Sequence, residues 1–176
     1  NNKIGHIKQD WDVMIPLGSC TRYTGDALAL VAAKSPEALD EIIGLIHVEY
    51  TVLESITTPK RALESDAPFI HEGGNVLAVE HLRRGDPDSA ITKSKYVVRH
   101  IYRTGATEHA FMEPECAVAV PEGDTLLVYS ASQSIYDEQR EISNMLQISP
   151  EKIHCHAMLV GGGFGGKEDM SVQHHA

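Results

Sequence analysis

The chain has 176 residues, of which 42% are hydrophobic, and 25 acidic residues against 15 basic ones give a net charge of −10 at pH 7. This length fits one ordinary domain or two small ones, and the apolar content supports a packed core and argues against a disordered chain. An acidic surface repels a phosphate backbone, and no apolar stretch approaches the roughly 20 residues that span a bilayer, so we expect neither nucleic acid nor a membrane as a partner.

The first half of the chain has the pattern of a strand, a helix and a second strand. Residues 27–33 form a continuous apolar run, which suits a buried strand. Ser35, Pro36 and Glu37 then supply an N-cap, a proline at the first helical position and an early acid. Apolar residues at helical spacing follow, namely Leu39, Ile42, Ile43 and Ile46. Residues 47–52 alternate as a strand does, so the sequence predicts a right-handed βαβ unit.

A polar, turn-rich stretch at residues 83–88 marks a predicted domain boundary. Beyond it, residues 96–102 have the composition of a strand. Two further apolar runs, 116–120 and 125–129, predict a hairpin across the turn residues 121–124.

The last predicted elements lead to a glycine-rich loop. Residues 138–146 carry Ile142, Met145 and Leu146 on one helical face, and residues 152–160 predict a strand. Helices and strands alternate in this way along the whole chain, so the predicted fold class is α/β (α+β).

The glycine loop is the most informative feature of the sequence. Five of the eight residues from Gly161 to Glu168 are glycine, and such a loop at a strand end is a common anion cradle. Gly161, Gly163 and Gly166 satisfy the dinucleotide fingerprint, but that motif needs an acid about 20 residues further on. Gly161 to Lys167 satisfies most of a P-loop, but Glu168 stands where Mg²⁺ requires serine or threonine. A plain tight turn is a third interpretation.

The surrounding residues favour a more specific interpretation. The run from Gly161 to Glu168 resembles the molybdopterin-contacting loop of the xanthine dehydrogenase and aldehyde oxidase family. Other stretches resemble that family in the same order: residues 25–38 and 48–50 its hammerhead α/β domain, 109–115 the start of its molybdenum-cofactor domain, and 130–133 its Ser-Thr-Gln stretch. The resemblance therefore implies a partial hammerhead domain at residues 1–86 and the N-terminal part of a molybdopterin-cofactor-binding domain at 87–176.

The resemblance also implies the site residues. Gln133 matches a glutamine beside the oxo ligand of the metal, and Phe164 matches a residue whose backbone N–H approaches an oxygen ligand. The cofactor-binding set implied by the family is Gln133, Gly162, Gly163, Phe164, Gly165 and Gly166. Each has a simpler alternative: Gln133 as a helix cap, and Phe164 as the apolar plug of a turn.

Glu168 matches a carboxylate that contacts substrate in the purine-hydroxylating relatives, where aldehyde-oxidising relatives often have an apolar residue. A carboxyl group can donate to a ring nitrogen or accept from a ring N–H. The alternative is a glutamate favoured at the start of a helix. Glu113 either supports the site residues from behind or is a turn acid before Pro114, and the second interpretation is favoured.

Four histidines near the end of the chain do not form a convincing metal site. His154 and His156 would share one strand face, with Cys155 on the other, and no carboxylate or thiol completes a ligand set. We interpret them, together with His174 and His175, as solvated or core residues.

The predicted function is that of a fragment of a molybdenum hydroxylase, which hydroxylates purines or related N-heterocycles with oxygen from water. The resemblance implies a molybdenum–molybdopterin cofactor, [2Fe–2S] clusters and FAD on partner domains or subunits, and an oligomer when the enzyme is complete. The family's general base and its substrate-clamping arginine are expected downstream, so this chain alone is predicted to be inactive and to carry no catalytic residue.

Two finer predictions accompany this function. The sequences of residues 1–16 and 71–75 most resemble the selenium-dependent bacterial branch of the family. This resemblance suggests selenium as a further component of the complete enzyme. Three widely spaced cysteines, Cys20, Cys116 and Cys155, and the lack of a signal peptide predict a reducing, cytoplasmic location. The alternative functions are a non-catalytic, truncated interaction module and a P-loop-like phosphate or nucleotide binder.

Overall fold

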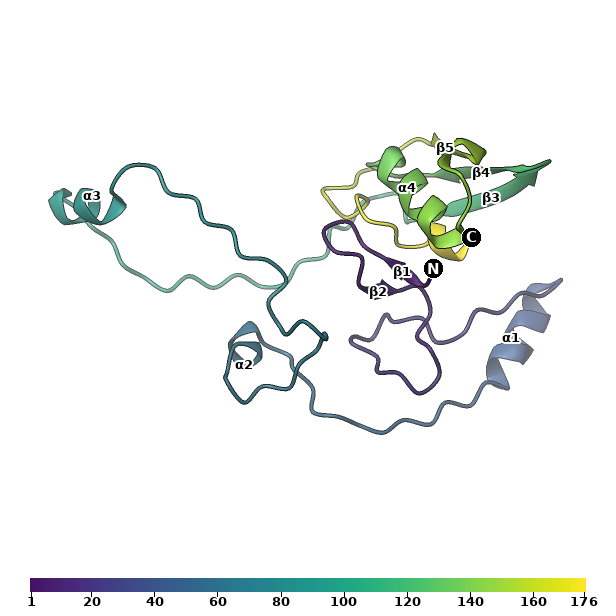
Figure 1. The fold of residues 1–176 in the computed structure, drawn as a ribbon, viewed down its shortest axis with the longest axis horizontal. Helices are drawn as coiled ribbons and strands as arrows, with labels where there is room; N and C mark the ends of the chain where they lie inside the picture. The colour runs from purple at the N-terminus through teal and green to yellow at the C-terminus, as the bar shows by residue number, and fades with distance from the viewer. The chain divides into compact units, whose positions relative to one another are not determined.

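The computed structural model describes residues 1–176, which divide into two compact units. Unit 1 consists of residues 1–51 and 109–176, and unit 2 consists of residues 52–108. Figure 1 shows the elements of both units as a ribbon. The mixed α/β composition agrees with the predicted fold class, and no helix has the length and apolar character needed to cross a membrane.

A three-stranded sheet forms the centre of unit 1. The strands β3 (Ala117–Glu122) and β4 (Thr125–Ser130) pair as an antiparallel hairpin. The strand β5 (Ile153–Ala157) lies parallel to β4, which gives the order β3-β4-β5. The predicted hairpin and the predicted strand before the glycine loop are both confirmed, although β5 ends three residues before residue 160.

The helix α4 (Ile135–Leu146) connects the two parallel strands, because a parallel pair requires a crossover connection. It covers the sheet in Figure 1, begins three residues before the predicted start, and ends where Gln147 takes a left-handed conformation with φ 60°. A short 3-10 segment, Pro150–Lys152, leads into β5. The βαβ unit of this protein is therefore β4-α4-β5.

The core of unit 1 lies between α4 and the sheet and is completed by the start of the chain. Two short strands, β1 (Lys3–Ile4) and β2 (Trp11–Asp12), pair antiparallel. Ile4 is 2% exposed, although no pattern in the sequence predicts an element there. The buried core residues are Ile4, Val13, Val128, Ile142, Ile153 and Met170.

The βαβ unit predicted for residues 27–52 is not present. Its helix is confirmed as α1 (Pro36–Gly44), and the Ser35 hydroxyl accepts from the Ala38 N–H at 3.3 Å. Residues 27–33 and 47–52 form no strands, because no neighbouring segment bonds to them as a ladder beyond a single bond from the Ile15 N–H to the Ala27 carbonyl. An apolar run alone does not make a strand when it has no partner.

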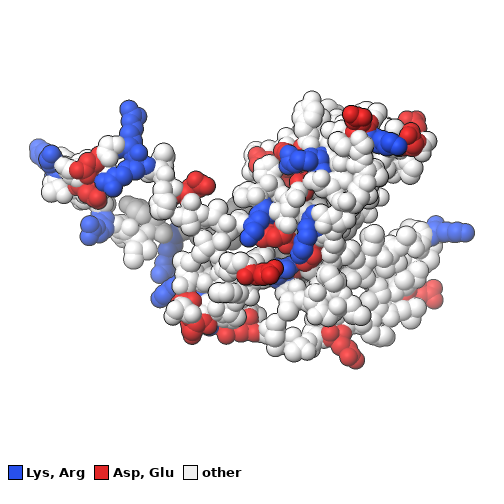
Figure 2. Space-filling model, viewed as in Figure 1, with Lys and Arg blue, Asp and Glu red and all other residues white.

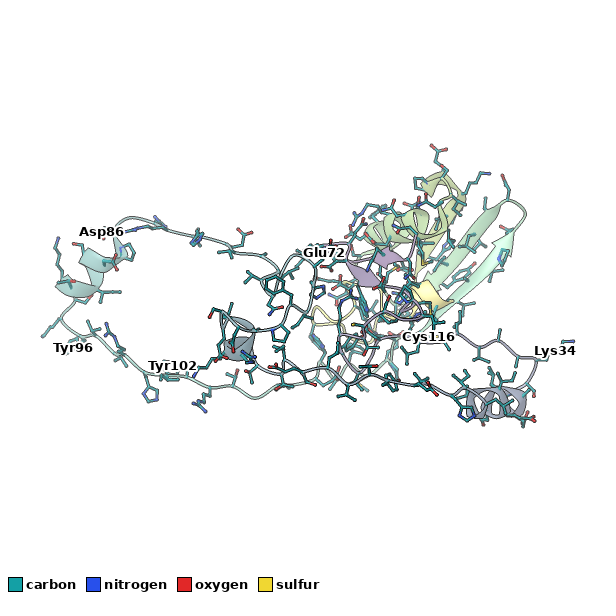
Figure 3. All side chains as sticks on the ribbon, turned by 60° about the horizontal axis from the view of Figure 1, so that its bottom comes forward. Lys34, Glu72, Asp86, Tyr96, Tyr102 and Cys116 are labelled. Carbon is teal, nitrogen blue, oxygen red and sulfur yellow. The ribbon has the colours of Figure 1, made fainter.

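Unit 2 contains two short helices and extended connections. They are α2 (Pro59–Ala62) and α3 (Pro87–Lys93), capped by the side chains of Thr58 and Asp86. The strand predicted at residues 96–102 is wrong: Figure 3 shows Tyr96 and Tyr102 on an extended run without a paired strand.

Polar contacts organise unit 2. The Arg61 guanidinium donates to carboxylates of Glu54, Glu64 and Asp66 at 2.7–3.0 Å, and Ala67 is the only buried apolar residue of the unit. Acidic and basic side chains are interspersed on the face drawn in Figure 2, as expected for a solvated surface.

Candidate functional site

The parallel pairing of β4 and β5 brings two loops of unit 1 to one edge of the sheet. Ser130 and Ala157 are register partners at the carboxyl ends of these strands, and the Met158 N–H donates to the Ser130 carbonyl at 2.8 Å. The segment with Gln133 leaves β4 at this edge, and the glycine loop follows β5. The carboxyl ends of parallel strands are a common place for ligand sites in α/β proteins.

Gln133 binds the glycine loop through its side-chain carbonyl. Its Oε1 accepts from the backbone N–H of Gly165 at 3.1 Å and from that of Lys167 at 3.2 Å. Because both facing groups are donors, the atom between them must be the amide oxygen. The Nε2 group therefore remains the donor end of Gln133.

Gly163 is the place where a side chain could not be accommodated. A Cβ atom on Gly163 would lie 2.2 Å from Oε1 and 2.5 Å from Cδ of Gln133. The absence of a side chain is what lets the loop contact this amide so closely. The sequence grouped Gln133 and Gly163 in one predicted site, and the structure brings them together.

Phe164 has an unusual backbone conformation at the tip of the loop. Its φ is 54°, in the left-handed region that L-residues with bulky side chains rarely adopt, and its side chain is 74% exposed. The N–H groups of Gly162, Gly163 and Phe164 donate to no acceptor within the chain. Strained residues of this kind cluster at ligand sites.

Glu113 and Lys167 form an ion pair at the glycine loop, which the sequence did not predict. The Lys167 ammonium is 2% exposed and lies 2.9 Å from the Glu113 carbonyl, 3.3 Å from Glu113 Oε2 and 4.3 Å from the centre of the Phe111 ring. The Gly161 N–H donates to the same Oε2 at 2.7 Å. That hydrogen bond and the Lys167 ammonium lower the pKa of Glu113.

Glu138 on α4 supports the segment that carries Gln133. This side chain is 2% exposed, and the Ser130 hydroxyl lies 2.9 and 2.8 Å from its two oxygens. Burial raises the pKa of Glu138, against the opposing effect of hydrogen bonds from Ser130, Ser132 and Gln173. The sequence analysis did not single out Glu138; its place four residues before Ile142, on the buried face of α4, was the available signal.

The structure does not group Glu168 with the loop residues around Gln133. Its side chain is exposed and lines a small pocket together with His6, Trp11 and Asp169. Neither Gln133 nor Phe164 lines that pocket.

The four histidines lie in two pairs in unit 1: His154 and His156 on β5, and His174 and His175 in the short 3-10 segment Gln173–His175. His156 stacks on Tyr129 with ring centres 4.9 Å apart, and the His154 ring contacts the Glu151 carbonyl. His174 is 8% exposed, packs against the His175 and Trp11 rings, and has an Nδ1 atom without a hydrogen-bond partner. Burial and the neighbouring His175 lower the pKa of His174 to about 4.

Two generic interpretations of the glycine loop disagree with this geometry. A P-loop lysine must reach a phosphate, whereas the Lys167 ammonium is buried against Glu113. Both the P-loop and the dinucleotide fingerprint place the glycines before a helix, whereas residues 161–172 contain none. The loop is held by side chains from other segments and does not begin a helix.

Comparison with known proteins gives one family match. The model of the family described as "Molybdopterin cofactor-binding domain" matches residues 70–176. This range includes the glycine loop, Gln133 and the Glu113–Lys167 pair.

Three of the similar curated proteins are named as subunits of dehydrogenases. The chain is 38% identical over 175 residues to the nicotinate dehydrogenase large molybdopterin subunit of Eubacterium barkeri, which covers 99% of this chain and 41% of the relative. It is 34% identical over 176 residues to a probable xanthine dehydrogenase subunit of Bacillus subtilis, covering 99% of this chain and 23% of that protein. The xanthine dehydrogenase molybdenum-binding subunit of Escherichia coli O157:H7 is 33% identical over 150 residues, or 85% of this chain and 20% of the relative.

Proposed function

This chain belongs to the molybdopterin cofactor-binding domain family and, within it, to the molybdenum-binding subunits of the xanthine dehydrogenase family, and we propose that its glycine loop and Gln133 contact a molybdenum cofactor. The observation that carries this proposal is the hydrogen bonding of Gln133 Oε1 to the amides of Gly165 and Lys167. This contact uses the oxygen of the Gln133 side chain, so its NH₂ group is the end that can donate to a ligand. The chain spans 41% of the nicotinate dehydrogenase subunit, so the activity of the whole protein is part of the proposal.

The residues at this edge of the sheet fit such a cofactor. Oxo and phosphate oxygens need hydrogen-bond donors, and the backbone N–H groups of Gly162, Gly163 and Phe164 have no acceptor within the chain. The glycines remove the Cβ atoms that would keep an anionic ligand away from this backbone. The fit supports the proposed cofactor-binding set: Gln133, Gly162, Gly163, Phe164, Gly165 and Gly166.

The bound cofactor would supply an oxidising metal centre that takes two electrons from the substrate and activates water for hydroxylation. The residues of this chain would bind and orient it. Gln133 Nε2 would donate a hydrogen bond to an oxygen on the metal, and the Phe164 N–H would donate to a second. Neither group is proposed as a direct ligand of the metal, because an amide N–H has no lone pair to offer.

We propose that the substrate is a purine or a related N-heterocycle. The curated relatives named after nicotinate and xanthine support this class, since both compounds are nitrogen heteroaromatics. The net change is replacement of a ring C–H by C–OH, with oxygen from water and release of two protons and two electrons. Glu168 is proposed to contact the substrate ring by hydrogen bonding.

The electrons would leave through [2Fe–2S] clusters and FAD on partner domains or subunits of a cytoplasmic, oligomeric enzyme. The general base is proposed to come from a segment downstream of residue 176, so this chain alone should be inactive. We further propose selenium as a component of the complete enzyme. The proposed domains are a partial hammerhead domain at 1–86 and the N-terminal part of a cofactor domain at 87–176.

The test is to isolate the native, untagged polypeptide that contains this chain and to measure its intact mass and its molybdenum and selenium contents. We expect about one molybdenum per polypeptide, and hydroxylation of xanthine or nicotinate that incorporates ¹⁸O from labelled water. A polypeptide without molybdenum would contradict the proposal and favour an interaction module. A stabilising thermal shift with ATP or GTP would instead favour a nucleotide binder.

A further inference from the structure

We propose that Glu113 and Lys167 are positioning residues that hold the glycine loop in the conformation in which Gln133 and Phe164 face the cofactor. The inference rests on the proposed function of the loop. It assigns a role to two residues that the sequence interpretation left outside the site. Neither side chain is expected to contact cofactor or substrate.

The Lys167 ammonium is buried against Glu113. This group is 2% exposed, and its partners are the carbonyl and Oε2 of Glu113 at 2.9 and 3.3 Å and the Phe111 ring at 4.3 Å. A buried ammonium is strongly unfavourable without a paired acceptor. The loop therefore cannot move away from Glu113 without exposing or unpairing this charge.

Glu113 contacts both ends of the loop. Its Oε2 accepts from the Gly161 N–H at 2.7 Å and from the Lys167 ammonium at 3.3 Å. A second bond, from the Met112 N–H to the Gly161 carbonyl at 3.2 Å, holds the same end. One carboxylate oxygen thus binds the first residue of the glycine loop, Gly161, and Lys167 near its end.

The backbone of Lys167 connects this pair to the proposed site. Lys167 donates its backbone N–H to Gln133 Oε1 at 3.2 Å and accepts from the Gln133 N–H at 2.8 Å. The side chain of Lys167 is thus held by Glu113 while its backbone holds Gln133. A loss of the ion pair would be transmitted to Gln133 through a single residue.

The close approach of the two segments agrees with this role. A Cβ atom on Gly161 would lie 2.6 Å from Glu113 Cβ and 3.0 Å from the Glu113 backbone nitrogen. Only a residue without a Cβ atom can bring the loop backbone this close to Glu113. We call this arrangement the Glu113–Lys167 clasp: the Glu113 carboxylate binds both the Gly161 backbone N–H and the Lys167 ammonium.

The test compares Glu113→Gln, Lys167→Met and the double variant in the full-length protein, with Glu115→Gln as the control. Glu115 is an exposed acid two residues away with no hydrogen bond to another residue. The first readout is hydrogen exchange of the hydrogen-bonded loop amides, those of Gly161, Gly165, Gly166 and Lys167, in protein prepared without molybdenum. The second is the change in kcat and KM of the loaded enzyme.

We expect each single variant to speed loop exchange at least tenfold, to leave exchange in α4 and β5 unchanged, and to lower kcat about 100-fold with KM within threefold. The double variant should be no worse than the poorer single variant, because the two side chains act as a unit. Glu115→Gln should match the unsubstituted protein.

Unchanged loop exchange would overturn the proposal, and so would an equal loss of protection in α4 and β5, which would mean a merely structural role. The exchange readout needs no cofactor, so it tests the clasp even if the wild-type protein contains no molybdenum. A failure of the proposed function and a failure of this inference are therefore distinguishable.

Discussion

Gln133 and Lys167 bind each other reciprocally across 34 residues of sequence: the Gln133 N–H donates to the Lys167 carbonyl at 2.8 Å, and the Lys167 N–H donates to Gln133 Oε1 at 3.2 Å. This pair closes the glycine loop onto the segment that follows β4. Because the side-chain oxygen of Gln133 is used in this contact, its NH₂ group is the end that can serve a ligand. Substitutions around this pair should change the cofactor content of the protein. Substitutions at the buried titratable groups of unit 1 should change its stability.

Gly163→Ala should displace Gln133. The new Cβ atom would lie 2.2 Å from Gln133 Oε1, which is closer than atoms can approach, so the amide must leave its position. We expect the molybdenum content of the full-length protein to fall at least tenfold. Metal analysis of the purified variant, alongside its thermal unfolding midpoint, provides the measurement.

The matched control for this substitution is Gly105→Ala. A Cβ atom on Gly105 would meet nothing within 4 Å, and its φ lies outside the left-handed region. Metal content equal to that of the unsubstituted protein is expected. If Gly163→Ala retained its molybdenum as well, the close contact with Gln133 would have no part in cofactor binding.

Glu138→Gln should stabilise the protein at neutral pH. Burial raises the pKa of Glu138 above its ordinary value of 4.5, so the folded state binds the proton more tightly than the unfolded state does. The favourable contribution of this group is therefore complete below pH 4.5 and is lost as pH rises through the folded pKa. Glutamine removes this cost because it has no charge to bury.

Thermal unfolding at pH 7.5 and at pH 4 measures this effect. The unfolding midpoint of Glu138→Gln should exceed that of the parent protein at pH 7.5, and the difference should vanish at pH 4. An exposed glutamate, Glu151, supplies the control as Glu151→Gln, which should change neither midpoint. A midpoint for Glu138→Gln below that of the parent protein at pH 7.5 would show that the ionised carboxylate is favourable in the fold.

His174 should make the protein sensitive to acid. Burial lowers the pKa of His174 from 6.5 to about 4, so the folded state favours the neutral ring. Its contribution is present above pH 6.5 and is lost as pH falls toward 4, at about 1.4 kcal/mol for each pKa unit.

Replacement by phenylalanine removes both the titration and the unpaired Nδ1 atom. The loss of stability between pH 6.5 and 4 should accordingly be smaller in His174→Phe than in the parent protein. Urea unfolding at several pH values in this range checks the slope. His47→Phe, at an exposed histidine, should leave the slope unchanged. Equal slopes in the parent protein and His174→Phe would mean that His174 is not buried as a neutral ring.

Local patterns in the sequence predicted the elements that depend on local chemistry. Ser35 before Pro36 marked the start of α1, and the turn residues 121–124 marked the β3–β4 hairpin. The strand predicted at residues 27–33 was wrong because a strand needs a neighbouring strand to bond to, and an apolar run does not show whether one is present. The same limit applies to the site, since the Lys167–Glu113 contact spans 54 residues and leaves no local pattern.

Cys155 should be far less reactive than the other two cysteines of this chain. Burial, together with the nearby Glu138 charge, raises the pKa of its thiol to about 12, and the thiolate is the reactive form. Cys20 and Cys116 are exposed and serve as internal controls. Brief treatment with iodoacetamide at pH 8 and peptide mass mapping should show modification of Cys20 and Cys116 at least tenfold faster than of Cys155. Comparable rates at all three would show that β5 opens readily, because Cys155 lies in that strand beside Val128.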